Sequence, residues 1–292
     1  MKTRIRVTVV GMLACWLAAA PVFVPLLAEP ISVGAGKQTV NLGGTRMDVY
    51  TYRPAQCPDP SLLLVFHGAA RDAEDYRDYA RGLADRQCML VVAPLFDRKR
   101  FPSWRYQRGG IVDVSGAVQN PRDFTGRLVL DLVGWARQRE GRNLSYSLIA
   151  HSAGGQFLGR LVAFVPNEAK RVVIANPGTY VLASLTVDAP YGLGKVYSAA
   201  NGEEQLRRYL QQPLTIYLGE ADDRDDDRNN SAEARAQGAS RLARGLNAFN
   251  AAKSLAQARS WTFNWRLIEL PGVGHNAGKM LSAPQASEAL AP

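Results

Sequence analysis

Residues 146–156 read YSLIAHSAGGQ, a short apolar run followed by a small-x-Ser-x-Gly turn. The run predicts a buried strand that ends at Ala150, and the serine of the turn is Ser152. This spacing is typical of a nucleophile elbow, a strained strand-to-helix turn that projects a serine hydroxyl clear of a sheet. Ala150 and Gly154 are small enough to let the strand and the following helix approach each other. The stretch therefore predicts a reactive serine, with an ordinary Ser-Gly turn as the alternative.

Three further apolar runs end in turns with polar residues. Residues 62–66 (LLLVF) stop at HGAA, residues 214–218 (LTIYL) stop at GEADD, and residues 265–270 (WRLIEL) stop at PGVGH. Together with the elbow they give the serial order serine, acid, histidine. The combination resembles the α/β-hydrolase family over nearly all of the chain after about residue 38. More loosely, it is similar to secreted esterases of the polyhydroxybutyrate-depolymerase and feruloyl-esterase kind.

The resemblance implies an α/β fold with a mostly parallel central sheet and helices on both faces, and the residue pattern agrees with it. Short apolar runs occur at residues 62–66, 89–93, 145–150, 171–175, 214–218 and 263–270. Helical patterns separate several of them, which favours a sheet covered on both faces. Residues 38–53 alternate around two glycines and predict an opening hairpin. Asn120 and Pro121 predict the start of a helix whose apolar stripe is Phe124, Leu128, Leu132 and Trp135.

The beginning of the chain has the layout of a secretory signal. Lys2, Arg4 and Arg6 precede a long uncharged apolar run, and we expect residues 1–28 to be removed. A retained membrane anchor is the alternative, because the run is long enough to span a bilayer. Removal takes away three basic and no acidic side chains, so the net charge falls from +9 to +6. We expect a secreted or periplasmic enzyme with one domain over residues 29–292 and no stable membrane span.

The expected partner is a small or polymeric ester substrate. The basic residues are scattered rather than clustered with aromatic residues, so nucleic-acid binding is not expected. Two cysteines remain after residue 28. Cys57 and Cys88 each lie just before a predicted strand, and the two strands are expected to be neighbours. A disulfide between them fits an exported protein, with two buried free thiols as the alternative.

A serine hydroxyl needs a base within hydrogen-bond reach and a third group to orient that base. The chain has three histidines, His67, His151 and His275. His67 belongs to the loop after residues 62–66, and His151 flanks the elbow and is expected to point away from the base position. The remaining histidine, His275, is therefore the predicted base.

The acid has two candidates, because Asp222 and Asp223 both follow residues 214–218. The Gly-x-x-Asp spacing of the family selects Asp222, three positions after Gly219. Residues 225–227 are an acidic run, for which we expect a solvated loop. A calcium site is the alternative there, but the run lacks the glycine and the final glutamate of an EF-hand.

Acyl transfer also needs donors for the developing oxyanion, and the predicted donors are the backbone N–H groups of Ala69 and Ala153. Two long connections, residues 94–120 and 176–213, are expected to build the substrate site. Their aromatic residues Trp104, Tyr106 and Tyr180 are the predicted substrate contacts, or alternatively pack the loops down. No His-x-x-x-His pair and no phosphate-binding glycine loop occurs, so we expect neither a metal nor another cofactor.

The sequence thus predicts a secreted serine hydrolase that cleaves carboxylic esters through an acyl-Ser152 intermediate. Two alternatives remain. The same triad would serve a peptidase or amidase, and a hydrolase scaffold could also be an inactive binding protein.

Overall fold

The computed structural model of the chain describes residues 29–198, 200–223 and 231–291; the predicted signal at residues 1–28 and the acidic run at 225–227 lie outside this part. Within it, eight strands form one sheet in the order β1-β2-β4-β3-β5-β6-β7-β8. The strands are β1 (Gly34–Leu42), β2 (Thr45–Arg53), β3 (Ser61–Phe66), β4 (Met89–Pro94), β5 (Tyr146–His151), β6 (Val172–Ala175), β7 (Leu214–Gly219) and β8 (Arg266–Leu270). The pairs β1–β2 and β2–β4 are antiparallel and the others are parallel, so the sheet opens with the predicted hairpin and is mostly parallel, as expected.

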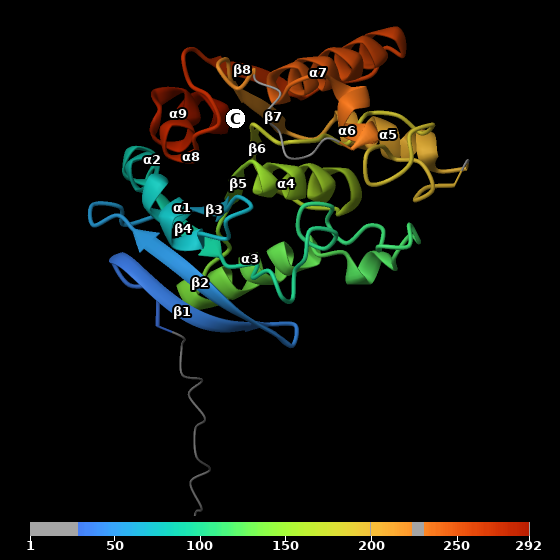
Figure 1. Cartoon of the computed structure of the whole chain (residues 1–292). Helices are drawn as coiled ribbons and strands as arrows, with labels where there is room; N and C mark the ends of the chain where they lie inside the picture. The colour runs from blue at the N-terminus through green and yellow to red at the C-terminus, as the bar shows by residue number, and fades with distance from the viewer. Residues whose placement is uncertain (1–28, 199, 224–230, 292) are drawn as a thin grey trace, which may run out of the picture.

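Helices cover both faces of the sheet (Figure 1). They are α1 (Ala73–Tyr79), α2 (Arg81–Gln87), α3 (Arg127–Glu140), α4 (Ala153–Phe164), α5 (Gly202–Leu210), α6 (Ala232–Gln237), α7 (Arg241–Ala258), α8 (Ala277–Ser282) and α9 (Pro284–Leu290), with one 3₁₀ turn, η1 (Pro121–Asp123). Among the residues described, no helix combines the length and the apolar character needed to cross a membrane.

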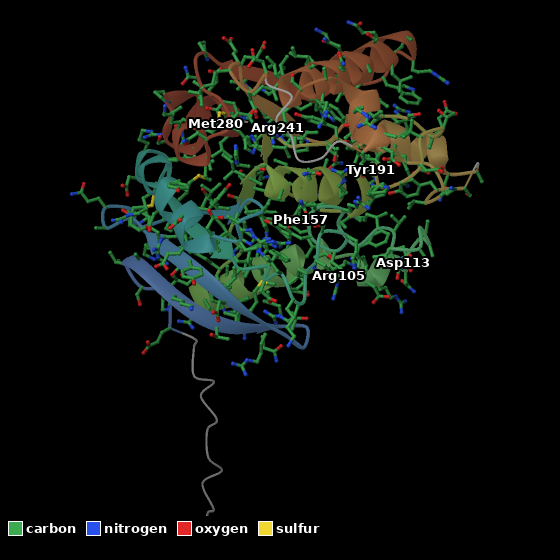
Figure 2. The ribbon with its side chains drawn as sticks, viewed as in Figure 1. Arg105, Asp113, Phe157, Tyr191, Arg241 and Met280 are labelled. Atoms are coloured by element: carbon green, nitrogen blue, oxygen red, sulfur yellow. A yellow bond between two sulfur atoms is a disulfide. The ribbon has the colours of Figure 1, made fainter. Side chains whose placement is uncertain are left out.

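Successive side chains of the parallel strands point to opposite faces of the sheet, so they pack into two separate apolar cores. In β3, Leu62 and Leu64 face the core made with α3, α4, α5 and α7, whereas Leu63 and Val65 face the core made with α1, α2, α8 and α9. The strands read as continuous apolar runs because both faces are buried. Phe157 on α4 and Met280 on α8 belong to the two different cores (Figure 2).

The helix predicted to begin at Asn120 is divided in the structure, so that prediction was wrong in its boundary. The Asn120 side chain accepts a hydrogen bond from the N–H of Arg122 at 2.9 Å, but it caps only the 3₁₀ turn η1. Phe124 then adopts an extended conformation, and α3 begins at Arg127. The N–H of Thr125 donates instead to the carbonyl of Gly109 at 2.9 Å. A contact with the long loop at residues 94–120 therefore interrupts the local helix signal.

The predicted disulfide is present. Cys57 and Cys88 are bonded with 5.3 Å between their Cα atoms. They can meet because β3 and β4 are neighbouring parallel strands, with Leu62 opposite Leu90. Both cysteines precede their strands and so lie at the amino edge of the sheet. The opposite, carboxyl edge is where the turns with polar residues converge.

Two arginines, one fully buried and one half-buried, hold the long connections in place. Arg160 on α4 is fully buried, and its guanidinium donates to the carbonyls of Thr179 at 2.9 Å and Pro190 at 3.1 Å. Arg71 does the same for the other connection, donating to the carbonyls of Phe96 and Phe101 at 2.7 and 2.8 Å. A guanidinium carries several donors in a fixed fork, so one side chain can satisfy several loop carbonyls. These contacts fix the loops that surround the carboxyl edge.

Candidate active site

The predicted elbow is formed by the end of β5 and the start of α4. Ser152 lies between them with φ 57° and ψ −118°, a backbone conformation that is rare for residues other than glycine. Gly154 follows on α4, where a Cβ atom would lie 2.6 Å from the carbonyl oxygen of Phe66 on β3. A larger residue there would push the helix away from the neighbouring strand. The strained turn and the glycine together fix the serine above the sheet edge.

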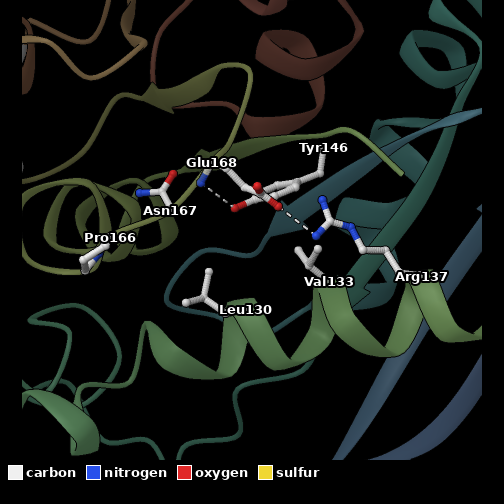
Figure 3. A pocket seen from close by; sticks show the side chains of 7 residues that line it. All are labelled: Leu130, Val133, Arg137, Tyr146, Pro166, Asn167 and Glu168. Carbon is white, nitrogen blue, oxygen red and sulfur yellow. Dashed lines mark hydrogen bonds and ion pairs between the residues drawn. The ribbon is translucent and has the colours of Figure 1, made fainter. Parts of the chain in front are cut away.

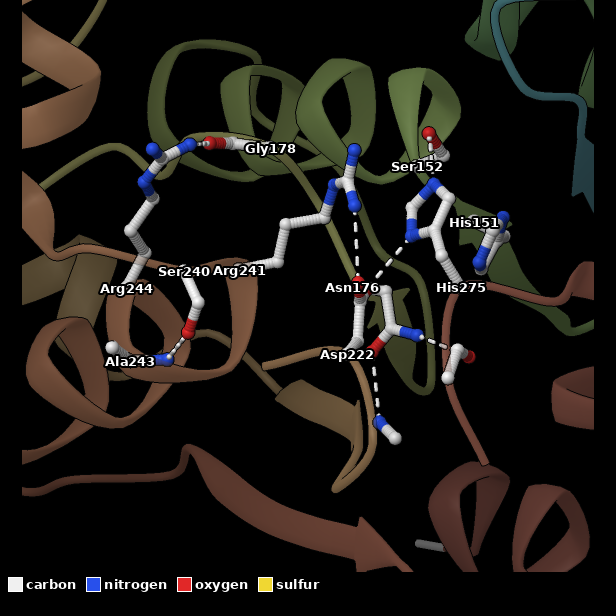
Figure 4. A network of polar contacts seen from close by, with 12 residues as sticks. His151, Ser152, Asn176, Gly178, Asp222, Ser240, Arg241, Ala243, Arg244 and His275 are labelled. Atoms are coloured by element: carbon white, nitrogen blue, oxygen red, sulfur yellow. Dashed lines mark hydrogen bonds and ion pairs between the residues drawn. The ribbon is translucent and has the colours of Figure 1, made fainter. Parts of the chain in front are cut away.

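Ser152, His275 and Asp222 form one chain of hydrogen bonds (Figure 4). The Ser152 Oγ lies 2.9 Å from His275 Nε2, and His275 Nδ1 lies 2.7 Å from Asp222 Oδ2. A carboxylate accepts from Nδ1–H, so Nε2 is left as the acceptor for the serine hydroxyl. Asp223, the other candidate acid, is exposed, whereas Asp222 is 4% exposed. The structure thus brings together the predicted nucleophile, the predicted base and the first of the two candidate acids.

Asp222 carries its charge in a buried position. Burial acts to raise the pKa of Asp222, but hydrogen bonds and charge from His275 and Arg241 outweigh it and hold the pKa below its ordinary value. Arg241 Nη1 lies 3.0 Å from Asp222 Oδ1, on the oxygen that His275 does not use. The acid is therefore ionised where it meets the imidazole.

Asn176 joins the acid loop to the histidine loop. It follows β6, and its side-chain oxygen accepts from the N–H of Gly219 at 2.8 Å, while its amide donates to the carbonyl of Gly274 at 3.3 Å. Gly219 ends β7 so close to the other loop that a Cβ atom there would lie 2.3 Å from the carbonyl oxygen of Val273. These contacts hold the two loops in register, which sets the distance between Asp222 and His275.

The His-Gly turn after β3 lies beside the serine. A Cβ atom on Gly68 would be 3.9 Å from the Cβ of Ser152. His67 is buried and neutral, because burial lowers the pKa of His67 to about 4. Its Nε2 accepts from the N–H of Phe96 at 3.1 Å, and its Nδ1 donates to the carbonyl of Gly68 at 2.9 Å. His67 therefore anchors the turn that carries Ala69.

The two predicted oxyanion donors differ in setting. Ala153 is the first residue of α4, where a helix leaves its N–H groups without intrahelical partners. Ala69 is exposed and lines the same pocket as Ser152. In the part of the chain that the structure describes, neither N–H makes a hydrogen bond.

A pocket of about 340 Å³ surrounds the serine. Its lining comes from the His-Gly turn and α1 on one side and from the histidine loop on the other. The lining residues are Gly68, Ala69, Ala70, Asp72, Tyr76, Tyr79, His151, Ser152, His275, Asn276, Ala277 and Gly278. Tyr79 presents a partly exposed ring near Gly278, and one buried carboxylate oxygen of Asp72 has no hydrogen-bond partner among the described residues.

The solved structures that match this chain include two at 30% identity or more. Poly(aspartic acid) hydrolase-1 from Sphingomonas sp. KT-1 is 31% identical, with a TM-score of 0.81, over 89% of this chain and 99% of that one. LpqC, a poly(3-hydroxybutyrate) depolymerase from Bordetella parapertussis, is 30% identical, with a TM-score of 0.79, over 89% of this chain and 96% of that one. The chain belongs to the α/β-hydrolase family. A scan of protein-family models finds no match to this hydrolase, and a search of curated proteins finds none either.

Two of the three aromatic residues predicted to contact substrate are core residues of the hydrolase, and that prediction fails for them. Tyr106 is fully buried, and its hydroxyl donates to the carbonyl of His67 at 2.7 Å. Tyr180 is 3% exposed, and its backbone is held on both sides by the Gln237 side chain. Trp104 is half-buried and does not line the pocket around Ser152. The loops can pack inward because Arg71 and Arg160 satisfy several of their backbone carbonyls.

His151 does not occupy the base position, yet it lies closer to it than we expected. Its ring centroid is 4.4 Å from that of His275, and its Nδ1 lies 3.2 Å from the hydroxyl of Tyr76. Burial lowers the pKa of His151 well below its ordinary value, so the ring is neutral. In the hydrolase, this uncharged ring packs against the imidazole of His275.

A second hollow of the hydrolase lies at the opposite edge of the sheet (Figure 3). It has a volume of about 430 Å³ and opens beside Tyr146, the first residue of β5. Arg137 pairs with Glu168 across it at 2.8 Å, and the Tyr146 hydroxyl accepts from the N–H of Glu168 at 3.1 Å. None of the predicted site residues lines this hollow.

Two residues that hold the site together, Asn176 and Arg241, were not predicted from the sequence. The sequence did contain an indication of Asn176, because this polar residue directly follows an apolar run. Ser152 and Asp222 also lie within a few positions of the end of such a run. Arg241 had no such indication, because it lies 19 positions beyond Asp222 at the start of a helix with weak apolar periodicity. Only the docking of α7 against β7 brings it to the acid.

Proposed function

We propose that the hydrolase cleaves carboxylic esters through an acyl-serine intermediate on Ser152. The observation that carries the proposal is the continuous hydrogen-bond chain from Ser152 Oγ to His275 Nε2 at 2.9 Å and from His275 Nδ1 to Asp222 Oδ2 at 2.7 Å. A serine, a base and an orienting acid in this order are the parts that nucleophilic acyl transfer requires.

In the proposed reaction the Ser152 oxygen attacks the ester carbonyl carbon while its proton passes to His275 Nε2. The carbonyl oxygen becomes an oxyanion, which the N–H groups of Ala69 and Ala153 would bind. The C–O bond of the ester then breaks, and the alcohol leaves with the proton from His275. Water attacks the acyl-serine with His275 again taking a proton, which releases the acid and restores Ser152. Asp222 stays ionised throughout and stabilises the imidazolium.

The proposed substrates are bulky or polymeric esters as well as small ones. The pocket around Ser152 includes exposed residues on both sides, among them Ala69, Ala70 and Asn276, so a long substrate would not need to enter a closed cavity. The similarity to a poly(3-hydroxybutyrate) depolymerase also favours a polyester.

Amide cleavage is a second candidate, and one observation favours it. The protein is 31% identical to a poly(aspartic acid) hydrolase, whose named substrate is a polyamide. The same triad chemistry serves amides if His275 protonates the leaving nitrogen.

We also propose that the protein works outside the cytoplasm after removal of residues 1–28, with residues 29–292 as one catalytic domain. The Cys57–Cys88 disulfide supports this location, because disulfides persist in oxidising compartments.

A panel of p-nitrophenyl esters and peptide anilides tests the proposal, with wild type and Ser152→Ala measured side by side. We expect ester turnover by wild type and a loss of about 10⁴-fold or more in the variant. A fluorophosphonate probe should label wild type at Ser152 and leave the variant unlabelled. Anilide turnover above ester turnover would favour the amidase, and absence of both labelling and turnover would favour an inactive binding protein.

A further inference from the structure

Each of the two carboxylate oxygens of Asp222 has its own side-chain hydrogen-bond partner. His275 Nδ1 lies 2.7 Å from Oδ2, and Arg241 Nη1 lies 3.0 Å from Oδ1 (Figure 4). The last side-chain torsion of an aspartate is broad, so an isolated carboxylate can turn about that bond. A contact on each oxygen removes this freedom.

The backbone around Arg241 is itself fixed against the acid loop. Arg241 is the first residue of α7, and the next residue, Leu242, donates its N–H to the carbonyl of Asp222 at 3.2 Å. Ser240 caps the helix by accepting from the N–H of Ala243 at 3.1 Å. The start of α7 is thus bonded to the same residue whose side chain Arg241 contacts.

Arg244 adds a second anchor one turn along the helix. It is fully buried and donates to the carbonyls of Gly238 at 2.9 Å and Gly178 at 2.8 Å. Gly178 belongs to the loop that follows β6 and Asn176, so α7 is tied to the strand next to the acid. The backbone that carries Arg241 is therefore held at both ends of the first helical turn.

The ion pair between Asp222 and Arg241 is largely shielded from solvent. The side chains of Asp222 and Arg241 are 3% and 12% exposed, so water screens their attraction only weakly. A guanidinium is always charged and carries planar donors, which suits it to hold a buried carboxylate in one plane.

We propose that Arg241 is a positioning residue that fixes the plane of the Asp222 carboxylate so that Oδ2 faces His275. The inference rests on the proposed function, because it assigns Arg241 a part in orienting the proposed base. Arg241 does not touch the reacting atoms and does not line the pocket around Ser152.

The test compares Arg241→Met, which removes charge and donors, with Arg241→Lys, which keeps the charge but loses the planar fork. Lys253→Met is the matched control, since Lys253 is an exposed cation on the same helix. We expect Arg241→Met to lower kcat by about 10- to 10²-fold, because small misplacements of catalytic groups cost this much. KM should stay within about two-fold of wild type, Arg241→Lys should recover part of kcat, and the control should match wild type.

A second readout does not depend on turnover. The His275 Nδ1 proton, held in the bond to Asp222, gives a low-field NMR resonance that should weaken or shift in Arg241→Met and less in Arg241→Lys. Melting temperatures identify any unfolded variant, and Arg241→Lys carries the test if Arg241→Met does not fold. A purely structural role would lower the melting temperature and leave kcat and this resonance of the folded protein unchanged.

Wild-type kcat and an unchanged resonance in both variants would overturn the proposal. A raised KM with wild-type kcat would also overturn it, by assigning Arg241 to substrate binding. If Ser152→Ala were as active as wild type, the proposed function would fail instead, and the resonance would still decide whether Arg241 positions Asp222.

Discussion

The imidazole of His151 packs beside the imidazole of His275, with 4.4 Å between the ring centroids. The two rings come from different parts of the chain, one from the end of β5 and one from the loop after β8. His151 is buried and its pKa is well below the ordinary value because of that burial, so it adds no positive charge beside His275. The pair therefore consists of one exposed imidazole, which is hydrogen-bonded to Ser152, and one neutral ring that packs against it.

Substitutions at the two histidines should distinguish the proposed base, His275, from the neutral ring that packs beside it, His151. His151→Phe keeps an aromatic ring in the same space, and we expect it to retain most of kcat, whereas His275→Phe should lose about 10⁴-fold or more. His151→Ala should lower the free energy of unfolding by about 2–4 kcal/mol through the cavity it leaves. Steady-state ester hydrolysis and urea unfolding measure these effects. An inactive but folded His151→Phe would assign His151 a direct part in proton transfer.

The acid is tested by amide substitutions at two adjacent residues. Asp222→Asn should lower kcat by about 10⁴-fold, because an amide favours the wrong imidazole tautomer while leaving the geometry nearly intact. Asp223→Asn, at an exposed neighbour, should have little effect and serves as the matched control. Both are measured as kcat on one short-chain ester. Equal small losses would mean that another group orients His275.

The turn that carries Ala69 is held by Tyr106, whose hydroxyl donates to the carbonyl of His67 at 2.7 Å. Tyr106→Phe leaves that buried carbonyl without its donor, so we expect a loss of about 1–3 kcal/mol in the free energy of unfolding. We also expect kcat to fall modestly with KM unchanged, since the turn carries Ala69. Trp104→Phe, outside the pocket, is the control. A raised KM in Tyr106→Phe would restore the substrate-contact role first predicted for this residue.

Buried neutral histidines should make the protein less stable in mild acid. The pKa of His67 is about 4 in the folded protein because of burial, against an ordinary value near 6.5. The unfolded chain therefore binds a proton that the folded chain does not, and stability falls as the pH drops from about 6.5 toward 4. Each such histidine contributes at most about 1.4 kcal/mol per pH unit in this range.

The measurement is the free energy of unfolding at pH 7.5 and pH 5.5 for wild type and His67→Gln. Glutamine can accept the Phe96 N–H bond but does not titrate, so the variant should lose less stability between the two pH values. A second comparison between pH 7.5 and pH 8.5 should show no difference in slope. Identical losses in acid for both proteins would rule out His67 as a source of the effect.

The disulfide should stabilise the fold without affecting the chemistry. Its cysteines are 31 positions apart, which on the chain-entropy model corresponds to about 3–4 kcal/mol. The double variant Cys57→Ser, Cys88→Ser should show this loss in denaturant unfolding and keep wild-type kcat, because the bridge lies at the edge of the sheet opposite Ser152. Wild type under reducing conditions is the control. A large loss of kcat in the folded variant would contradict this separation.

The sequence alone was sufficient for the order of the strands along the chain and the turn at Ser152, and it led to the prediction of His275 as the base. These features are local: a buried strand reads as an apolar run, an elbow needs small residues on either side of its serine, and three histidines leave few choices. The Cys57–Cys88 pairing also followed, because neighbouring parallel strands begin at the same edge.

Only the tertiary structure decided which loop residues face the pocket and what holds the acid. Tyr106 and Trp104 lie two positions apart in one loop, and nothing in their order indicates that the first is buried. The contacts of Asn176 with Gly219 and Gly274, and of Arg241 with Asp222, join segments that are far apart in sequence. Side-chain burial and buried charge pairing depend on how helices and loops dock against the sheet, and that docking has no local sequence period to reveal it.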